Sequence, residues 1–419
     1  MKLEAAELID ERPDERLDTS RLEPYLRTHL PGAEGKLVVR QFGGGKANLT
    51  YLLRFGTPTL RGSATAGHTN EKALPLDGGG LGGGDCAGLA VEARSRGQNS
   101  PPPQPSPIEG EGGVREFVLR RPPLGPIPPG AHDMAREHRV LSRLHQRYRL
   151  APRSLLLCED ESVIGAVFIV EERRHGFVIR DDIPDEFAGR PELNRHIGEA
   201  LVDALADLHL VMPAEIGLGD LGRPEGYNER QLAGWGRRWQ TAQGGDEAER
   251  AAALMMPVLD WLGGHLPAHS QSKPGGAALL HNDYRLDNCL LDTADPGRIA
   301  AVLDWDMCTQ GDPLADLGYV LNYWVDPGDP PEWREIASMP TWREGFPSRA
   351  AAIERYAART GFDVGAIGWH QVFAAFKLAV IIQQIYIRFV RGQTQDRRFR
   401  HYYRRVLGLA EKARSLAGL

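Results

Sequence analysis

This 419-residue chain contains two polar clusters that decide its fold, His281-Asn282-Asp283-Tyr284-Arg285-Leu286-Asp287-Asn288 and Leu303-Asp304-Trp305-Asp306. Short apolar segments flank both clusters, at residues 277–280, 289–291 and 299–303. Apolar runs of this length, bounded by polar residues, are typical of short buried strands. Such strands would present the polar side chains of both clusters along one rim.

The order and spacing of three of these polar residues are typical of a phosphotransfer site. In such sites an Asp takes the proton of the acceptor hydroxyl, an Asn in the same loop binds Mg²⁺, and an Asp after the next strand binds metal that bridges the phosphates. Asp283, Asn288 and Asp304 occupy these places in that order. We therefore predict that Asp283 is the catalytic base and that Asn288 and Asp304 are metal ligands.

Neighbouring residues are further candidates for the same site. Asp306 fits either a second metal site or a turn, since Asp is favoured in turns. Arg285 suits a carboxylate or phosphate of the acceptor, or solvent. His281 is expected to brace the loop backbone in preference to taking part in the chemistry, while Asp312 and Asp316 are expected to anchor the loop and cap the following helix.

A glycine-rich hairpin is predicted near the N-terminus. Residues 36–55 alternate as two strands would, on either side of Gly43-Gly44-Gly45-Lys46-Ala47-Asn48. Glycines let backbone N–H groups approach phosphate oxygens, because no Cβ stands in the way. We predict that Gly43, Gly44, Gly45 and Asn48 contact a nucleotide; the alternative is that the glycines only form the turn, which any hairpin needs. A Walker A interpretation fails, since Ala47 replaces the Ser or Thr that would bind Mg²⁺.

Arg120 and Glu137 form a candidate ion pair. Arg120 lies in an alternating stretch at residues 114–120, and Glu137 lies in a helix-like stretch at 131–148. A cation on a strand and a carboxylate on the next helix position the phosphates in kinases. Arg120 departs from the usual Lys, and its planar, always-charged fork would rearrange the nucleotide contacts. The alternative is that both residues are ordinary surface charges, and the polar clusters at residues 281–288 and 303–306 argue against it.

The chain divides into a strand-rich part and a helix-rich part. Residues 57–113 contain 13 Gly, 7 Pro and no aromatic residue, so we expect them to form a disordered insertion in the N-terminal lobe, residues 1–170. Further strands are expected at 155–158 and 165–170. Residues 171–419 read as a helical lobe that carries the catalytic loop and the acceptor site. Helices are expected at 21–30, 192–210, 229–240, 247–266, 348–360 and 369–392.

Composition restricts the class of protein. A net charge of −6 provides no basic field for nucleic acid, and 42% hydrophobic residues suffice for a sizeable core. The four Cys residues show no CxxC pairing, which suits free thiols in a reducing cytosol. The first residues lack a signal-peptide core, and the late apolar run 378–382 is too short to span a bilayer. We expect a cytoplasmic protein without stable membrane association.

Three further patterns have ordinary explanations. Residues 217–222 match GxGxxG, but no strand precedes them and Arg223-Pro224 follows, so a loop is expected. Trp235 and Trp239 are spaced as core residues of a helix, with a substrate pocket as the alternative. A C-terminal basic cluster is expected to be a solvated face, with the phosphates of a CoA-like substrate as the alternative: Arg391, Arg397, Arg398, Arg400, Arg404 and Arg405.

Outside the insertion, the chain resembles small-molecule kinases of the aminoglycoside phosphotransferase fold, in the branch related to kinase domains fused to acyl-CoA dehydrogenases. The motifs that carry the resemblance are FGGGKANLTYLL, FVLRRPP, AHDMAREHRVL, HNDYRLDN, VLDWDMCTQGDPLADLG and FKLAVIIQQIYIRFVRGQT. The resemblance implies an α+β, protein-kinase-like bilobal fold with a small antiparallel-sheet N-lobe and a mainly helical C-lobe. It also implies ATP between the lobes, Mg²⁺ and a small-molecule hydroxyl acceptor, and it suggests a hydroxy acid or a hydroxyacyl-CoA.

Two alternatives compete with an active kinase. One is a catalytically degenerate nucleotide-binding or scaffold protein, motivated by Arg120 and by the insertion beside the glycine hairpin. The other is a two-metal hydrolase built from His281, Asp283, Asp304 and Asp306, since imidazole and carboxylates suit such sites. The hydrolase hypothesis explains neither the glycine hairpin nor Glu137.

Overall fold

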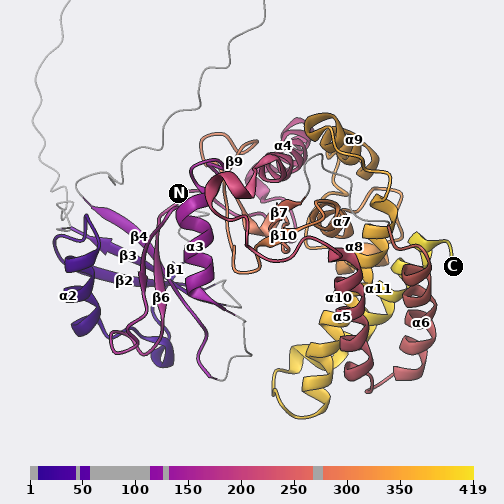
Figure 1. Cartoon of the computed structure of the whole chain (residues 1–419), viewed down its shortest axis with the longest axis horizontal. Coiled ribbons are helices and arrows are strands. Elements are labelled where there is room, and N and C mark those ends of the chain that lie inside the picture. The colour runs from indigo at the N-terminus through magenta and orange to yellow at the C-terminus, as the bar shows by residue number, and fades with distance from the viewer. Residues whose placement is uncertain (1–7, 44–47, 57–113, 126–131, 268–276) are drawn as a thin grey trace, which may run out of the picture.

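The computed structural model describes residues 8–43, 48–56, 114–125, 132–267 and 277–419. A strand-rich N-terminal lobe is followed by a larger helical lobe, which confirms the expected α+β bilobal fold (Figure 1). The predicted insertion at 57–113 lies outside the described residues, as do Gly44 and Gly45 of the predicted phosphate contact.

The N-terminal lobe is built on one antiparallel sheet with the strand order β1-β2-β3-β4-β6-β5. Phe117 and Leu119 of β4 face a core shared with α2, while Val118 and Arg120 face the other side and line the inter-lobe cavity. β6 ends at Glu172, so the predicted lobe boundary at residue 170 falls inside this strand. The strands are β1 (Leu8–Ile9), β2 (Leu37–Phe42), β3 (Leu49–Phe55), β4 (Arg115–Arg121), β5 (Ser154–Cys158) and β6 (Phe168–Glu172).

Two capped helices flank this sheet, α2 (Thr19–His29) and α3 (Met134–Leu144). The side chain of Asp133 accepts a hydrogen bond from the Arg136 N–H, which satisfies a free donor of the first turn of α3. The cap therefore fixes where α3 begins and puts Glu137 in its first turn. The Glu137 side chain is buried there.

The C-terminal lobe is a helical assembly around one large apolar core. Its longest helix, α10, lies between α5, α7 and α11 in the packing (Figure 1). Among the described residues α10 alone is long and apolar enough to cross a membrane, but 67% of its apolar window is buried inside the protein, as in a core helix. The helices are α4 (Pro191–Leu210), α5 (Tyr227–Ala242), α6 (Ala248–Gly264), α7 (Leu314–Tyr323), α8 (Glu332–Ile336), α9 (Arg349–Thr360), α10 (Ile367–Val390) and α11 (Tyr402–Ala417).

Two small antiparallel strand pairs hold the predicted catalytic loop, residues 281–288, within this helical lobe. β7 (Ala278–Leu280) pairs with β10 (Thr309–Gly311), and β8 (Cys289–Leu291) pairs with β9 (Ile299–Val302). The Leu303 N–H donates to the Asn288 carbonyl at 2.8 Å, which extends the second pair to the residue before Asp304. The two polar clusters of the sequence therefore lie side by side.

Candidate active site

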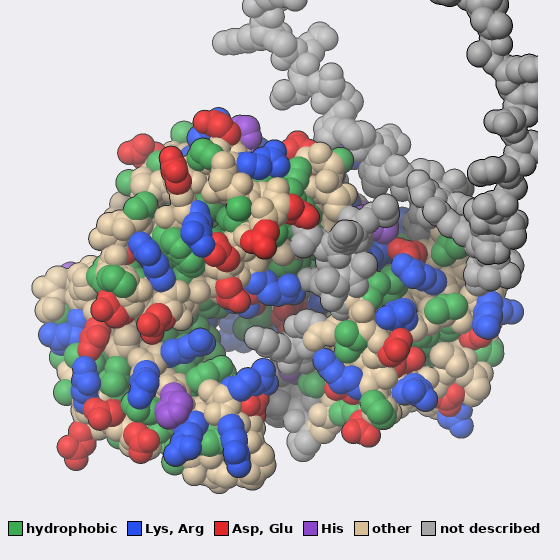
Figure 2. All heavy atoms as spheres, turned by 180° about the vertical axis from the view of Figure 1, so that it is seen from behind, with side chains coloured by type: hydrophobic (Ala, Val, Ile, Leu, Met, Phe, Trp, Pro, Cys, Tyr) green, Lys and Arg blue, Asp and Glu red, His purple; other side chains and the backbone are tan. Residues whose placement is uncertain are grey.

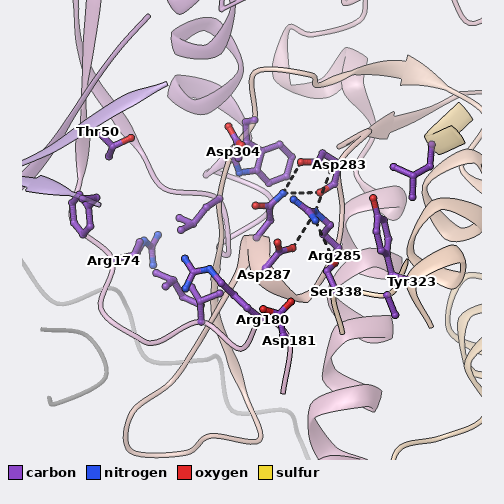
Figure 3. A pocket seen from close by; sticks show the side chains of 18 of the residues that line it. Thr50, Arg174, Arg180, Asp181, Asp283, Arg285, Asp287, Asp304, Tyr323 and Ser338 are labelled. Carbon is purple, nitrogen blue, oxygen red and sulfur yellow. Dashed lines mark hydrogen bonds and ion pairs between the residues drawn. The ribbon is translucent and has the colours of Figure 1, made fainter. Parts of the chain in front are cut away.

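A cavity of about 990 Å³ lies between the lobes and brings six of the predicted site residues together. Figure 2 shows the surface hollowed between the two lobes, with acidic and basic side chains interspersed over the helical lobe. In Figure 3, Thr50 of β3 lies across the cavity from Asp283, Asp287 and Arg285 of the catalytic loop. The predicted residues that line the cavity are Arg120, Glu137, Asp283, Arg285, Asn288 and Asp304.

The backbone of the catalytic loop is fixed by a buried carboxylate on α7. Asp316 accepts hydrogen bonds from the His281 N–H at 2.6 Å and from the Asn282 N–H at 2.8 Å. These bonds hold Asn282 in the left-handed region, at φ 65°. A left-handed conformation costs free energy for a residue with a side chain, so it persists only where the surroundings enforce it. Asp316 therefore acts on the loop as a structural anchor.

His281 is a structural residue of the loop. Its ring is fully buried, its Nε2–H donates to the Leu303 carbonyl at 2.8 Å, and its Nδ1 accepts from the Asp283 N–H at 3.3 Å. Because both ring nitrogens are engaged with the backbone, neither is available to a metal ion. This geometry agrees with the bracing role expected for His281 and removes a ligand from the two-metal hydrolase hypothesis.

The carboxylate of Asp283 is held from several sides. Its Oδ2 accepts from Asn288 Nδ2 at 3.0 Å, and its Oδ1 accepts from the Tyr319 hydroxyl at 2.9 Å. Arg285 Nε lies 3.5 Å from the same Oδ1. Since the donors come from the loop itself and from α7, the orientation of the predicted base is fixed by the fold.

Arg120 lies at the centre of a cluster of three carboxylates. Its guanidinium is 2.7 Å from Asp304, 3.1 Å from Glu137 and 3.9 Å from Glu171. The pair of Arg120 with Glu137 was expected from the sequence, whereas the contacts with Asp304 and Glu171 were not. Arg120 thereby links the N-terminal lobe to the predicted metal ligand.

Around Arg120, Glu137 and Glu171 are buried, whereas Asp304 is partly exposed. Burial raises the pKa of Glu171 to about 7 and raises that of Glu137 well above its ordinary range, although Arg120 opposes both shifts. Burial also opposes the ionisation of Asp304, but Arg120 outweighs burial and holds the pKa of Asp304 below its usual value. Asp304 is therefore the carboxylate of the three that stays ionised.

The residues present fit a magnesium ion. Mg²⁺ prefers hard oxygen ligands and is usually held by one or two carboxylates together with substrate phosphates. Asp304 supplies a carboxylate whose pKa is lowered, and the backbone hydrogen bond between residues 303 and 288 holds the two chain segments together, so that Asn288 and Asp304 line the same cavity. Both oxygens of Glu137 and one of Glu171 are buried without a hydrogen bond among the described residues, and Arg120 is their charged neighbour at 3.1 Å and 3.9 Å.

The remaining predicted residues lie at the edge of the site. Asn48 is buried, and its Oδ1 accepts a hydrogen bond from the Nδ1–H of His132 at 2.8 Å. The same His132 nitrogen lies 3.9 Å from Asp306. Burial and the neighbouring Asp304 raise the pKa of Asp306. A Cβ on Gly43 would lie 3.2 Å from Ile9, so this glycine also allows close packing against β1. None of these three predicted residues lines the cavity.

The wall of the cavity that the helical lobe forms includes arginines and apolar side chains. Arg285 is 3.0 Å from Asp287 and 3.3 Å from the Ser338 hydroxyl. Of the C-terminal basic cluster, whose expected role was a solvated face, two members line the cavity. The arginines and apolar residues of the helical lobe that line the cavity include Arg285, Arg334, Arg398 and Arg405 and Ile336, Trp342, Leu378, Ile382 and Tyr402.

Trp235 and Trp239 are buried in the core of the helical lobe and do not line this cavity. The GxGxxG match at residues 217–222 follows a short 3₁₀ helix, Pro213–Ile216, and lies in a turn without a preceding strand. Both findings agree with the ordinary roles expected from the sequence.

Sequence reasoning missed several residues of the site. Glu171 is the first residue of the helical lobe as predicted from the sequence, but it belongs to β6, where its alternation with Val170 puts it on the cavity face of the strand. Tyr319 follows Asp316 by three positions on a helix, a spacing that puts both side chains on one face. That spacing could have identified Tyr319 as a neighbour of the catalytic loop.

A bilobal fold, a cavity between the lobes and a loop that presents an Asp and an Asn beside a second Asp define a phosphotransferase of the kinase type. The chain belongs to the phosphotransferase enzyme family (APH), whose family model matches residues 108–361.

Solved structures resemble the whole chain. A Ralstonia eutropha protein provisionally assigned as an aminoglycoside phosphotransferase is 27% identical, has a TM-score of 0.70, and covers 96% of this chain and 99% of its own. A complex of the aminoglycoside phosphotransferase APH(4)-Ia with AMP-PNP and hygromycin B is 14% identical, has a TM-score of 0.51, and covers 95% of this chain and 98% of its own. The second likeness concerns the fold alone.

Among curated relatives, acyl-CoA dehydrogenase family member 11 of Gallus gallus is 30% identical over 342 residues. The match covers 78% of this chain but 40% of the relative, so the chain spans less than half the length of that protein.

Proposed function

We propose that this chain is an ATP- and Mg²⁺-dependent kinase that transfers the γ-phosphate to a hydroxyl of a small acidic molecule, such as a hydroxy acid or a hydroxyacyl-CoA. The observation that carries the proposal is the position of Asp283. It lies in one cavity with the Arg120–Asp304 cluster and with further arginines of the helical lobe. The AMP-PNP complex of a neighbour with the same fold supports nucleotide use.

The residues of the chain would divide the work between them. Asp283, with its orientation fixed by Tyr319 and Asn288, would take the proton of the acceptor hydroxyl. Asn288 and Asp304 would hold Mg²⁺, which when bound neutralises the charge that develops on the phosphates. Catalysis in such a site is mostly positioning and electrostatic stabilisation.

The side chains of the helical lobe that line the cavity support an acidic, partly apolar acceptor. Guanidinium groups bind carboxylates and phosphates in a bidentate manner, and Arg334 and Arg405 line the cavity. Arg398 lines it too, but its guanidinium already pairs with Asp396. Leu378 and Ile382 of α10 offer apolar contact in the same cavity. The acyl-CoA dehydrogenase relative is in keeping with an acyl substrate.

The proposal is tested by incubating the protein with MgATP and a panel of aliphatic hydroxy acids and their CoA thioesters. Aminoglycosides, which are cationic at neutral pH, are the comparison set. Phosphorylation of an acidic acceptor is expected, and it should weaken when Arg405 is replaced by Ala. Phosphorylation confined to aminoglycosides would contradict the acceptor class.

A catalytically degenerate nucleotide-binding protein is the second candidate. The observation that favours it is the contact of Arg120 with Asp304, which occupies one oxygen of the predicted metal ligand. ATP binding without transfer to any acceptor in the panel would support this candidate over the kinase.

A further inference from the structure

One helix controls both the backbone and the carboxylate of the catalytic loop. Asp316, in the first turn of α7, binds two loop N–H groups, and Tyr319, three residues later, donates its hydroxyl hydrogen to Asp283 Oδ1 at 2.9 Å. Residues three apart on a helix lie on the same face, so α7 meets the loop at two points. The position of Asp283 and its orientation thus depend on the same rigid element.

Tyr319 is itself held in place. Its ring is 6% exposed and contacts Tyr323 edge to face at 5.3 Å between centroids, with 3.2 Å between the two hydroxyl oxygens. Lys377 of α10 places its ammonium 5.0 Å from the centre of the Tyr319 ring and 5.6 Å from that of Trp235. A cation near an aromatic ring is attracted to its face, so α10 also limits the movement of Tyr319.

We propose that Tyr319 is a positioning residue for Asp283, a role that rests on the kinase function proposed above. The terminal torsion of an Asp side chain is broad, so a carboxylate held at a single oxygen samples several orientations. Tyr319 holds Oδ1 and Asn288 holds Oδ2, which together fix the plane of the carboxylate. Lys377 of α10, whose ammonium contacts the Tyr319 ring, supports this arrangement.

Kinetics of Tyr319→Phe test the role, with the hydroxy acid that the wild-type protein turns over fastest as the acceptor. We expect kcat to fall roughly 10- to 100-fold, the loss that a small displacement of a reacting group produces, while KM for ATP and for the acceptor stay close to wild type. Tyr386→Phe is the matched control, because this buried hydroxyl accepts from the Asp246 N–H away from the cavity. It should leave kcat unchanged.

Thermal unfolding tests the contact without any turnover. Tyr319→Phe should lower the unfolding midpoint of the wild-type protein and lower it less in an Asp283→Ala background, because the carboxylate partner of the hydroxyl is then gone and only the Tyr323 contact remains. Equal shifts in both backgrounds would overturn the proposed contact. A coupled shift together with an unchanged kcat would overturn the positioning role and leave Tyr319 a structural residue.

The two proposals fail in different ways. A wild-type protein that transfers phosphate to no acceptor overturns the kinase function, and with it any catalytic role of Tyr319, whatever the unfolding data show. An active wild-type protein whose Tyr319→Phe variant keeps its kcat overturns the inference on Tyr319 alone.

Discussion

The two sides of the inter-lobe cavity differ in how completely their polar groups are satisfied. On the catalytic-loop side, both ring nitrogens of His281 and both oxygens of Asp283 and Asp316 have partners within the chain. On the phosphate side, Arg120 faces three carboxylates, and Glu137 and Glu171 keep oxygens without a hydrogen bond among the described residues.

The difference indicates which part of the site is complete before ligands bind. Buried polar groups normally have partners, so the catalytic loop has a geometry determined by the fold. On the phosphate side, Glu137 and Glu171 keep buried oxygens without a hydrogen bond among the described residues, so this side is not fully satisfied by the chain itself. We infer that the loop is preorganised and that the Arg120 cluster depends on its ligands.

The largest expected effect is on turnover, from the removal of the predicted base. Asp283→Asn preserves the shape of the side chain and should lower kcat by roughly 10²- to 10⁴-fold, with nucleotide affinity close to wild type, because general-base catalysis is lost. Steady-state kinetics and calorimetry measure both quantities. Asp287→Asn is the control in the same loop, since Asp287 pairs with Arg285 at 3.0 Å and should reduce turnover far less. An Asp283→Asn variant with full turnover would refute the assignment.

The preorganised side should be sensitive to the loss of its anchor. Asp316→Ala leaves the loop N–H groups and His209 without their buried partner, so the free energy of unfolding should fall by roughly 3–5 kcal/mol. Denaturant titration measures this change. Asp182→Ala breaks an exposed pair with Arg343 and should cost at most about 1 kcal/mol. Equal losses in the two variants would remove the distinction between the loop and the surface.

The ligand-dependent side should tolerate change less than an exposed pair but more than the anchor. Arg120→Lys replaces a fork that reaches three carboxylates by a single ammonium, and the loss of one charged contact should lower stability by roughly 1.5–3 kcal/mol. Arg54→Lys, in the exposed pair with Glu116 on the same sheet, is the control. A stability unchanged by Arg120→Lys would mean that the fork geometry has no structural role.

The effect expected to matter least for the cavity is a pH dependence of stability that comes from Lys412 of α11, away from the site. Burial lowers the pKa of Lys412 from 10.5 to about 7 in the folded protein. Between these values the unfolded chain binds more protons than the folded one, so stability should rise with pH, by up to about 1.4 kcal/mol per pH unit from this group. In Lys412→Met this contribution should vanish. Identical pH dependence of unfolding in the two proteins would contradict the shift.

The catalytic loop could be predicted from the sequence because its information is local. Asp283 and Asn288 lie in one short loop, and the strands on either side have apolar runs that are easily recognised. The same locality identified most helices of the C-terminal lobe, where the apolar period extends over many residues. Helix α11 was seen only as a basic cluster, because its arginines masked the buried face formed by Val406, Leu409, Ala410 and Ala413.

The Arg120 cluster could be predicted only in part, because its members come from four separate elements. The pair of Arg120 with Glu137 follows from a strand and the next helix, but the contacts with Glu171 and Asp304 depend on how β6 and the helical lobe meet β4. Cavity residues from the C-terminus, such as Arg398 and Arg405, have no spacing that relates them to the catalytic loop. Tertiary packing alone brings them there.

Titration of the protein with ATP in the presence and absence of Mg²⁺, by calorimetry, tests most directly whether the phosphate side is completed by a metal–nucleotide ligand. The wild-type protein should bind ATP more tightly with Mg²⁺, and Asp304→Ala, shown to be folded by circular dichroism, should lose at least about tenfold in that affinity, as even the loss of an outer partner of a metal ligand does. Equal affinity of the wild-type protein and the variant for MgATP would contradict the account.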